Sequence, residues 1–289
     1  MVSASGTEPP LWPLDTGLRP EGKDGALVRT LASHLTYYER WASSWEFQAL
    51  LKARACAGNP GLGRAYEEGV APLVWEASRR ENFVDDARAM RQRVEHDSAR
   101  PGTQDRRIKL GPGGLRDVEF TVQLLQLVHG RADESLRVRG TLRALAALSA
   151  GGYVSREDAA VLDHGYRTLR LLEHRSQLLR LRRTHELPSR QENLRRIGRG
   201  IDREHLADPE ELRELFQSVR RQVRSVHESV YYRPLLGAAA ALSRDEMAMA
   251  PRAAHERLAA SSSAAPPGAS GRRRLPRPGR GAAPHPGPD

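Results

Sequence analysis

Apolar residues recur with helical spacing between residues 108 and 235, and this is the strongest structural signal in the chain. The first stripe has apolar residues at intervals of three and four, namely Leu115, Val118, Val122 and Leu125. Such intervals place the side chains on one face of a helix that packs against other helices. The stretch is therefore predicted to be helical with this face buried.

Two later segments carry the same pattern and also have recognisable helix starts. Ser155, with Asp158 three residues further on, resembles a capping box that opens a long helix. The sequence Asp208-Pro209-Glu210-Glu211 has the features of a helix start. Asp208 can act as the N-cap, Pro209 takes the first helical position, and the two glutamates place negative charge near the positive end of the helix. The two stripes comprise Leu162, Tyr166, Leu169, Leu172, Ser176 and Leu179, and then Leu212, Phe216, Val219, Val223, Val226 and Val230. Amphipathic helices joined by short loops predict an antiparallel bundle over residues 108–258.

The pattern before residue 108 is more varied. Residues 11–30 alternate apolar runs with glycine and proline, which predicts extended structure with turns. From Ser33 to about residue 100 the pattern becomes helical, with Ser33 as the expected N-cap and Tyr37, Tyr38 and Trp41 on one side. Asn59-Pro60 is expected to separate this part from the next helix.

The last segment, residues 259–289, differs in kind from the rest of the chain. Of its 31 residues, 23 are Ala, Gly, Pro or Ser. Such a segment has too few apolar side chains to form a core, so it is predicted to be disordered. A second interpretation is that it results from reading GC-rich codons out of frame.

Composition narrows the class of protein. Hydrophobic residues make up 39% and charged residues 28%, a balance typical of soluble proteins. Cys56 is the single cysteine, so no internal disulfide can form and a reducing compartment is expected. No stretch approaches the roughly 20 apolar residues of a membrane span, and residues 1–8 show no export signal. We therefore expect a cytoplasmic protein that does not bind membranes.

The net charge of +10 raises the question of nucleic-acid binding. Residues 251–289 hold seven arginines against two acids, so half of this charge lies in the last segment. The body is only mildly basic, and aromatic residues for base stacking amount to 5%. No nucleic-acid partner is expected, and a solvated charged surface explains the basic residues.

Four motifs in order give the chain a specific resemblance, which covers residues 11–258. They are Trp12-Pro13-Leu14-Asp15-Thr16-Gly17-Leu18-Arg19-Pro20-Glu21-Gly22-Lys23, Trp45-Glu46-Phe47-Gln48-Ala49-Leu50-Leu51-Lys52-Ala53-Arg54, Lys109-Leu110-Gly111-Pro112-Gly113-Gly114-Leu115-Arg116-Asp117-Val118-Glu119-Phe120 and Ser135-Leu136-Arg137-Val138-Arg139-Gly140-Thr141-Leu142. Together they resemble the bifunctional glutamine-synthetase adenylyltransferase and adenylyl-removing enzyme family. The family's enzyme has two related halves. The arginine within the motif Gly-Gly-Leu-Arg-Asp-Val-Glu-Phe makes the chain resemble the first of them.

The resemblance implies a fold and an activity. Each half of the family's enzyme pairs an α/β nucleotidyltransferase domain of the polymerase-β type with a helical domain. One half transfers AMP from ATP to glutamine synthetase, and the other removes AMP by phosphorolysis, with phosphate as substrate and ADP as product. Mg²⁺ is the implied cofactor, and glutamine synthetase and the PII signalling protein are the implied partners. For this chain the resemblance implies the AMP-removing half.

On this basis the chain is expected to be mainly α-helical and to begin partway through the catalytic domain. Residues 1–57 are interpreted as the C-terminal remnant of the nucleotidyltransferase domain and residues 58–107 as connecting helices. Residues 108–258 are the helical bundle, and residues 259–289 are the basic tail.

The resemblance also assigns candidate site residues. Asp15 matches the third acid of the superfamily, which makes it the candidate catalytic residue and metal ligand. The candidate contacts to nucleotide or phosphate are Arg19, Lys23, Lys52, Arg54 and Arg116. Alternatives remain for these cations. Arg19 and Lys23 could be solvated loop charges. Lys52 and Arg54 sit in an otherwise apolar segment, where Glu46 could simply pair with neighbouring cations. Arg116 could form a surface ion pair on a polar stripe with Glu119, Gln123 and Gln126.

The metal-binding pair that should accompany Asp15 is not found in the sequence. Carboxylates at Asp-x-Glu spacing share a face on a strand, but on a helix they point about 200° apart. Asp117 and Glu119 lie in a predicted helix, so they are not expected to hold one metal ion together. We therefore expect the chain alone to be inactive. The alternative is a non-catalytic helical module that binds glutamine synthetase or a signalling protein.

Overall fold

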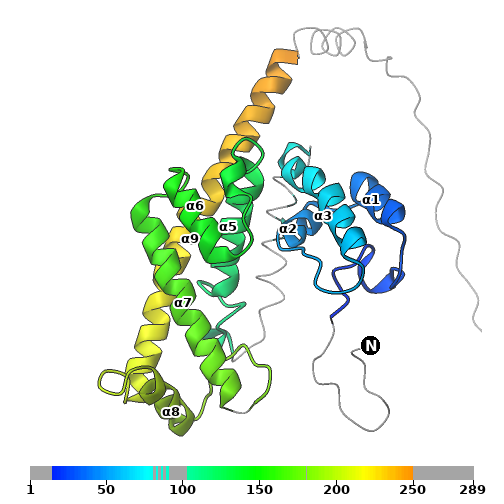
Figure 1. Cartoon of the computed structure of the whole chain (residues 1–289). Helices are drawn as coiled ribbons and strands as arrows, with labels where there is room; N and C mark the ends of the chain where they lie inside the picture. Colours follow the sequence, from blue (N-terminus) through cyan, green and yellow to red (C-terminus); the bar gives the residue numbers. More distant parts are fainter. Residues whose placement is uncertain are drawn as a thin grey trace, which may run out of the picture. The chain divides into compact units, whose positions relative to one another are not determined.

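The fold is mainly α-helical, as the sequence predicts. The computed structural model (Figure 1) describes residues 15–80, 83, 86, 89, 90, 103–179 and 181–249, with side chains as far as Tyr231. The chain divides into two units at residue 240, and the fold described below belongs to the first unit. The predicted disordered tail at residues 259–289 lies outside the described residues.

The bundle is built from α5 (Leu115–His129), α6 (Thr141–Ala150), α7 (Arg156–Leu178), α8 (Gln191–Ile201) and α9 (Pro209–Met249). The three predicted stripes form one core, because their residues on α5, α7 and α9 belong to a single buried cluster or pack against it. Contact along α7 and α9 is close: a Cβ added at Gly165 would lie 2.4 Å from a methyl carbon of Val223. The prediction of an apolar seam along each of these helices is confirmed.

The predicted helix starts in the bundle are confirmed as well. The Ser155 hydroxyl accepts a hydrogen bond from the backbone N–H of Asp158, at 3.0 Å, and α7 begins at the next residue. The Asp208 carboxylate accepts from the N–H of Glu210 at 2.9 Å, at the start of α9. These side chains satisfy backbone donors that the first helical turn leaves without partners.

Among the described residues, the helices α1 (Leu31–Arg40), α2 (Ser44–Leu50) and α3 (Pro60–Trp75) precede the bundle. The predicted cap at Ser33 is wrong, because the hydroxyl of Thr30 accepts the hydrogen bond from the Ser33 N–H and the helix begins at Leu31. Threonine also caps well, and the sequence offers both residues within one turn. The break at Asn59-Pro60 is confirmed, since Asn59 caps α3.

Two expectations about the early chain need correction. Trp41 does not join Tyr37 and Tyr38 in the interior, because α1 ends at Arg40 and the Trp41 side chain is 65% exposed. Residues 15–30 form turns and a short 3₁₀-helix (Gly22–Asp24), and no strand occurs among them. Part of the predicted extended segment, residues 11–14, lies outside the described residues.

Helix α5 has two buried faces. One face holds the predicted stripe and belongs to the bundle core. The other carries Phe120, Leu124 and Leu127, which join a second buried cluster with residues of α1, α2 and α3. The sequence analysis identified only the first face, so α5 is more central to the fold than its stripe suggested.

The predicted polar stripe of α5 is therefore largely buried, not a surface. Gln123 accepts a hydrogen bond from the side chain of Gln48 at 2.8 Å. The Gln126 amide donates to the carbonyl oxygens of Leu136 and Val138, at 2.7 and 2.9 Å. Buried polar groups require such partners, and here they connect α5 to α2 and to the loop before α6.

Within the part of the chain that the structure describes, no helix has the length and apolar character needed to cross a membrane.

Candidate functional site

Asp15 and Arg19 lie in the turns that precede α1. The Asp15 side chain is exposed and its Oδ1 accepts a hydrogen bond from the N–H of Gly17 at 2.9 Å. The Arg19 guanidinium donates to the carbonyl oxygens of Gly25, Thr16 and Lys23, at 2.8, 2.8 and 2.7 Å. Arg19 thus holds its own loop together. Lys23 is exposed in the same loop and Arg54 is exposed after α2, so these four residues are not brought together with Arg116.

The residues present do not fit a Mg²⁺ site by themselves. Mg²⁺ takes six oxygen ligands, which usually include one or two carboxylates together with waters and phosphate oxygens. Among the described residues, no group of three or more His, Cys, Asp or Glu side chains is placed to hold a metal ion. Asp15 lies in a turn that its own carboxylate stabilises.

Asp117 and Glu119 bind separate partners, as expected for neighbours two apart on a helix. Asp117 Oδ2 accepts from the Gly113 N–H at 2.7 Å and lies 3.7 Å from the Arg224 guanidinium. Glu119 Oε1 accepts from Arg170 at 2.7 Å. The prediction that these two acids lie on a helix is confirmed by their placement on α5.

The glycine-rich loop before α5 serves packing. Arg220 on α9 donates to the Pro112 carbonyl at 2.9 Å, and Gly113 has a positive φ of 71°. A Cβ at Gly113 would lie 1.9 Å from the carbonyl oxygen of Arg220. The positive end of α5 is neutralised by Asp117 in its first turn, so this helix start is not an open anion site.

A group of cations gathers instead around Glu119, at the place where the α2 end, the loop before α5, and α7 meet. We call Lys52, Lys109, Arg116 and Arg170 the basic cluster. Lys52 Nζ lies 3.8 Å from Glu119 Oε1 and donates to the Thr141 hydroxyl at 3.3 Å. The cluster combines two of the predicted phosphate contacts with two cations that the sequence analysis did not single out.

Lys109 and Arg116 are half-buried in this cluster. Burial lowers the pKa of Lys109, partly offset by the nearby Glu119 carboxylate. Burial likewise lowers the pKa of Arg116, offset by Glu119 and Asp117. Among the described residues, neither cation has a hydrogen-bond partner for its charged group, although Arg116 stacks over the Phe120 ring at 5.0 Å. Two partly dehydrated cations without direct partners form a place where an anion is stabilised.

The backbone around the two cations is firmly held. The N–H of Ile108 donates to the His185 carbonyl at 2.8 Å, and the N–H of Arg116 donates to the Lys109 carbonyl at 3.0 Å. Both side chains therefore start from backbone that is fixed by hydrogen bonds. Fixed geometry reduces the entropy lost when a ligand binds.

Arg170 and Glu173 anchor the far side of the cluster. Glu173 is 2% exposed and accepts from Arg170 and from the His185 ring, each at 2.7 Å. Burial alone would raise the pKa of Glu173, but the hydrogen bonds from His185 and Arg170 hold it below the ordinary value. Burial would lower the pKa of Arg170, yet its contacts with Tyr166, Glu173 and Glu119 raise it.

Sequence reasoning missed Arg170, Glu173 and the use of Lys109. Lys109 is the first residue of the third sequence motif, so examining every cation of that motif would have identified it. Arg170 and Glu173 are three residues apart on the polar side of α7, which is indistinguishable from an ordinary surface ion pair without the fold.

Comparisons with known proteins identify the family to which the chain is similar. The sequence profile described as glutamate-ammonia ligase adenylyltransferase matches residues 1–69. The profile described as GlnD PII-uridylyltransferase matches residues 88–231. Between them the two profiles include every member of the basic cluster.

Curated relatives share much of the sequence. The bifunctional glutamine synthetase adenylyltransferase/adenylyl-removing enzyme of Streptomyces coelicolor is 56% identical over 264 residues, which cover 90% of this chain and 26% of that protein. The proteins of the same name from Bifidobacterium longum strain NCC 2705 and Leifsonia xyli subsp. xyli are 50% and 54% identical, over 87% and 83% of this chain and 25% and 23% of their own lengths.

The chain spans about a quarter of the length of the curated relatives it matches. Its identity to them extends over nearly all of its own length, and the two profiles match consecutive parts of it. The chain belongs to the family of the bifunctional glutamine synthetase adenylyltransferases/adenylyl-removing enzymes.

Proposed function

We propose that this chain is part of an enzyme that controls glutamine synthetase by adding or removing AMP, and that the basic cluster holds the phosphates of the reacting nucleotide. The proposal for this half is AMP removal by phosphorolysis, with phosphate as substrate and ADP as product. The observation that supports it is the pair of half-buried cations, Lys109 and Arg116, which have no direct partner among the described residues.

The chemistry of AMP transfer explains why cations are needed. The phosphorus under attack carries oxygens that are already negative, and further charge develops on the attacking and leaving oxygens. In our proposal, Lys109 and Arg116 bind these oxygens directly. Glu119, which accepts a hydrogen bond from Arg170 at 2.7 Å, positions the side chains of the cluster around it. Mg²⁺, when bound by the complete enzyme, supplies further neutralisation of charge.

We propose that the basic cluster combines residues from two domains. Lys52 would come from the nucleotidyltransferase remnant at residues 1–57, and the other three cations from the helical bundle at residues 108–258. Residues 58–107 would connect the two, with the tail at 259–289 outside both. A nucleotide site between such parts would be formed only when both are present. Asp15, Arg19, Lys23 and Arg54 remain proposed contributors from the first part.

We further propose that glutamine synthetase is the substrate and that the PII protein is a regulatory partner. A cytoplasmic location is consistent with the single cysteine, which favours a reducing compartment.

Removing the two cations together is expected to weaken nucleotide binding. In the Lys109→Ala/Arg116→Ala variant, the Kd for ADP or ATP should rise about a hundredfold, since each lost charge-assisted hydrogen bond costs roughly 1.5 kcal/mol or more. Isothermal titration of the full chain would measure this. The matched control is Arg156→Ala/Arg195→Ala, which removes the same charge from exposed helix positions. Equal affinity of both variants and the unchanged chain would disprove the role of the cluster.

The chain on its own is expected not to carry out the transfer. The reason is that Asp15 does not belong to any group of three or more potential metal ligands among the described residues. The test is to incubate adenylylated glutamine synthetase with the chain, phosphate and Mg²⁺, and to measure the ADP released. Release above that of a reaction without the chain would contradict this expectation, and a full-length relative serves as the positive control.

A second candidate function is a non-catalytic docking module. It is favoured by exposed apolar side chains at the end of α7 and just after it, where Leu178 and Leu181 are 63% and 86% exposed. Exposed apolar groups close together are typical of surfaces that bind another protein. Capture of glutamine synthetase by the chain, lost in Leu178→Ser/Leu181→Ser and with no nucleotide binding at all, would favour this function over the first.

A further inference from the structure

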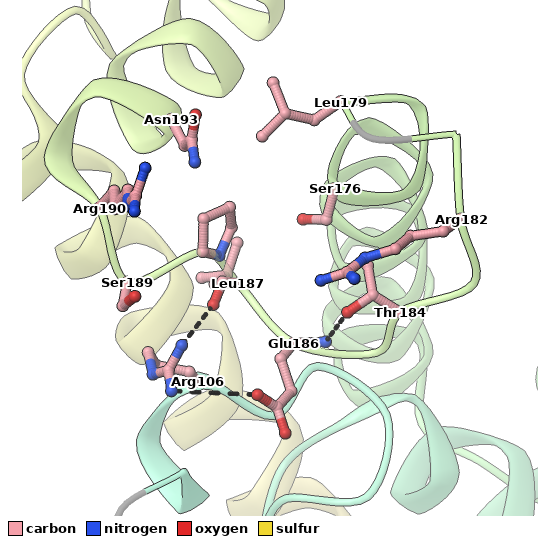
Figure 2. Close-up of a pocket in the computed structure, with 11 residues that line it drawn as sticks. Arg106, Ser176, Leu179, Arg182, Thr184, Glu186, Leu187, Ser189, Arg190 and Asn193 are labelled. Atoms are coloured by element: carbon pink, nitrogen blue, oxygen red, sulfur yellow. Dashed lines mark hydrogen bonds and ion pairs between the residues drawn. The ribbon is translucent and has the colours of Figure 1, made fainter.

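A second arginine-rich site lies at the end of α7, beyond Arg170 and Glu173 on the same helix. A pocket of about 160 Å³ opens between the end of α7, the segment 182–190 and the start of α8 (Figure 2). Its charged lining residues are Arg106, Arg182, Arg190 and Glu186. None of these residues belongs to the basic cluster.

The charge of the pocket favours an anion. Arg182 and Arg190 lie on opposite sides of it, with Arg106 at its lower edge in the view of Figure 2. Arg106 donates to the Leu187 carbonyl at 3.1 Å and lies 3.9 Å from Glu186. Within the described part of the chain, the guanidinium groups of Arg182 and Arg190 have no ion-pair partner. Two cations therefore remain available to a ligand.

Neutral donors complete the lining. Ser189 and Asn193 also line the pocket, from the loop and from α8. Ser176 lines it from α7, but its hydroxyl already donates to the Leu172 carbonyl at 2.8 Å. Hydroxyl and amide groups donate hydrogen bonds to an anion without adding charge. Arginine guanidinium groups match the geometry of phosphate oxygens and bind them with two parallel hydrogen bonds.

The size of the pocket limits the ligand. A volume of 160 Å³ is well above the roughly 10–15 Å³ of such space that one water molecule needs. Pockets for drug-sized ligands are larger, at about 300 Å³ or more. The space is therefore sufficient for a phosphate group.

The walls of the pocket are held together before any ligand binds. The N–H of Leu187 donates to the Arg106 carbonyl at 2.8 Å, and Arg107 and Glu186 form an isolated antiparallel bridge. Gln177 on α7 donates to the Thr184 carbonyl at 3.1 Å. A site fixed in this way loses little conformational entropy on binding.

We propose that this pocket binds a phosphate group, either as inorganic phosphate or as the phosphate of a small phosphomonoester. Arg182 and Arg190 hold the phosphate oxygens from opposite sides, and Ser189 and Asn193 donate to the remaining ones. The site goes beyond the proposed function, because it needs neither the basic cluster nor the transfer of AMP.

The test is a titration of the full chain with inorganic phosphate, followed by amide NMR. Signals of residues 184–193 are expected to shift with saturation. In Arg182→Ala/Arg190→Ala, the Kd from these signals should rise about tenfold or more, because two charge-assisted contacts are lost. The matched control is Arg183→Ala/Arg195→Ala, which removes two exposed arginines close in sequence that do not line the pocket. This control should bind as the unchanged chain does.

Two further titrations identify the kind of ligand and separate this pocket from the basic cluster. Glycerol phosphate binding more tightly than inorganic phosphate would support a phosphomonoester ligand, and equal or weaker binding would support phosphate itself. The Lys109→Ala/Arg116→Ala variant should leave the shifts at 184–193 unchanged, whether or not the cluster binds nucleotide. The proposal is overturned if these signals do not shift, if chloride at equal ionic strength shifts them equally, or if both arginine pairs have the same effect.

Discussion

Replacing Gly113 by alanine is expected to lower the free energy of unfolding by about 4 kcal/mol or more, among the largest effects of a single methyl group. Two costs combine. The positive φ of Gly113, 71°, costs roughly 1–2 kcal/mol for a residue with a Cβ. The new Cβ would also lie 1.9 Å from the Arg220 carbonyl oxygen, a backbone atom of α9 that cannot turn aside as a side chain would.

Urea denaturation followed by circular dichroism would measure the loss, with Gly152→Ala as the control. Gly152 also has a positive φ, 78°, but nothing lies within 4 Å of its added Cβ. The control variant should therefore lose only the roughly 1–2 kcal/mol that a positive φ costs a residue with a Cβ. Similar losses in the two variants would mean that the contact between the glycine loop and α9 is not as close as described.

Replacing Arg170 by leucine is expected to cost about 3 kcal/mol at neutral pH. Arg170 is the cation that Glu173 and Glu119 share, at 2.7 Å from each. Without it, two carboxylates with side chains only 3% and 13% exposed keep their burial and lose their main partner. The leucine preserves apolar packing, so the loss reports on charge and not on a cavity.

The loss should depend on pH. The pKa of Glu173 is depressed in the folded chain, so its stabilising contribution is present above the ordinary glutamate pKa of about 4.3 and is lost as the pH falls through the folded value. The difference in unfolding free energy between Arg170→Leu and the unchanged chain should therefore shrink below about pH 4.

The neighbouring Arg167 provides the control. It pairs with Asp163 one turn earlier on α7, but both side chains are largely exposed, at 64% and 40%. Arg167→Leu should cost at most about 1 kcal/mol. If Arg170→Leu costs no more than Arg167→Leu, or if its cost is the same at pH 3 and pH 7, the buried network does not stabilise the fold as argued.

The bundle could be predicted from the sequence because its information is local. Each of α5, α7 and α9 carries an apolar stripe within a single helix, and the caps at Ser155 and Asp208 lie within one turn of the residues they bind. Spacing alone defines such features. The error at Ser33 has the same origin, since local rules allow two caps and only the full backbone selects Thr30.

The candidate site could be predicted only in part, because it depends on contacts between distant segments. Lys52 and Glu119 are far apart in sequence, and so are Arg116 and Arg170. No periodicity relates them. The polar stripe of α5 was interpreted as a possible surface because nothing local reveals that a second set of helices covers it. Resemblance to a family pointed to Arg116 and Lys52, and only the fold placed Arg170 and Lys109 beside them.

The two buried faces of α5 also have a consequence for motion. For α1–α3 to swing away from the bundle, Phe120, Leu124 and Leu127 would have to enter water, which costs roughly 1.5–3 kcal/mol for each side chain. Such a conformation, at about 4.5 kcal/mol or more, is populated by fewer than one molecule in a thousand. A large motion in the described part of the chain must therefore use a hinge elsewhere, with α5 and the helices packed on both its faces moving as one rigid body.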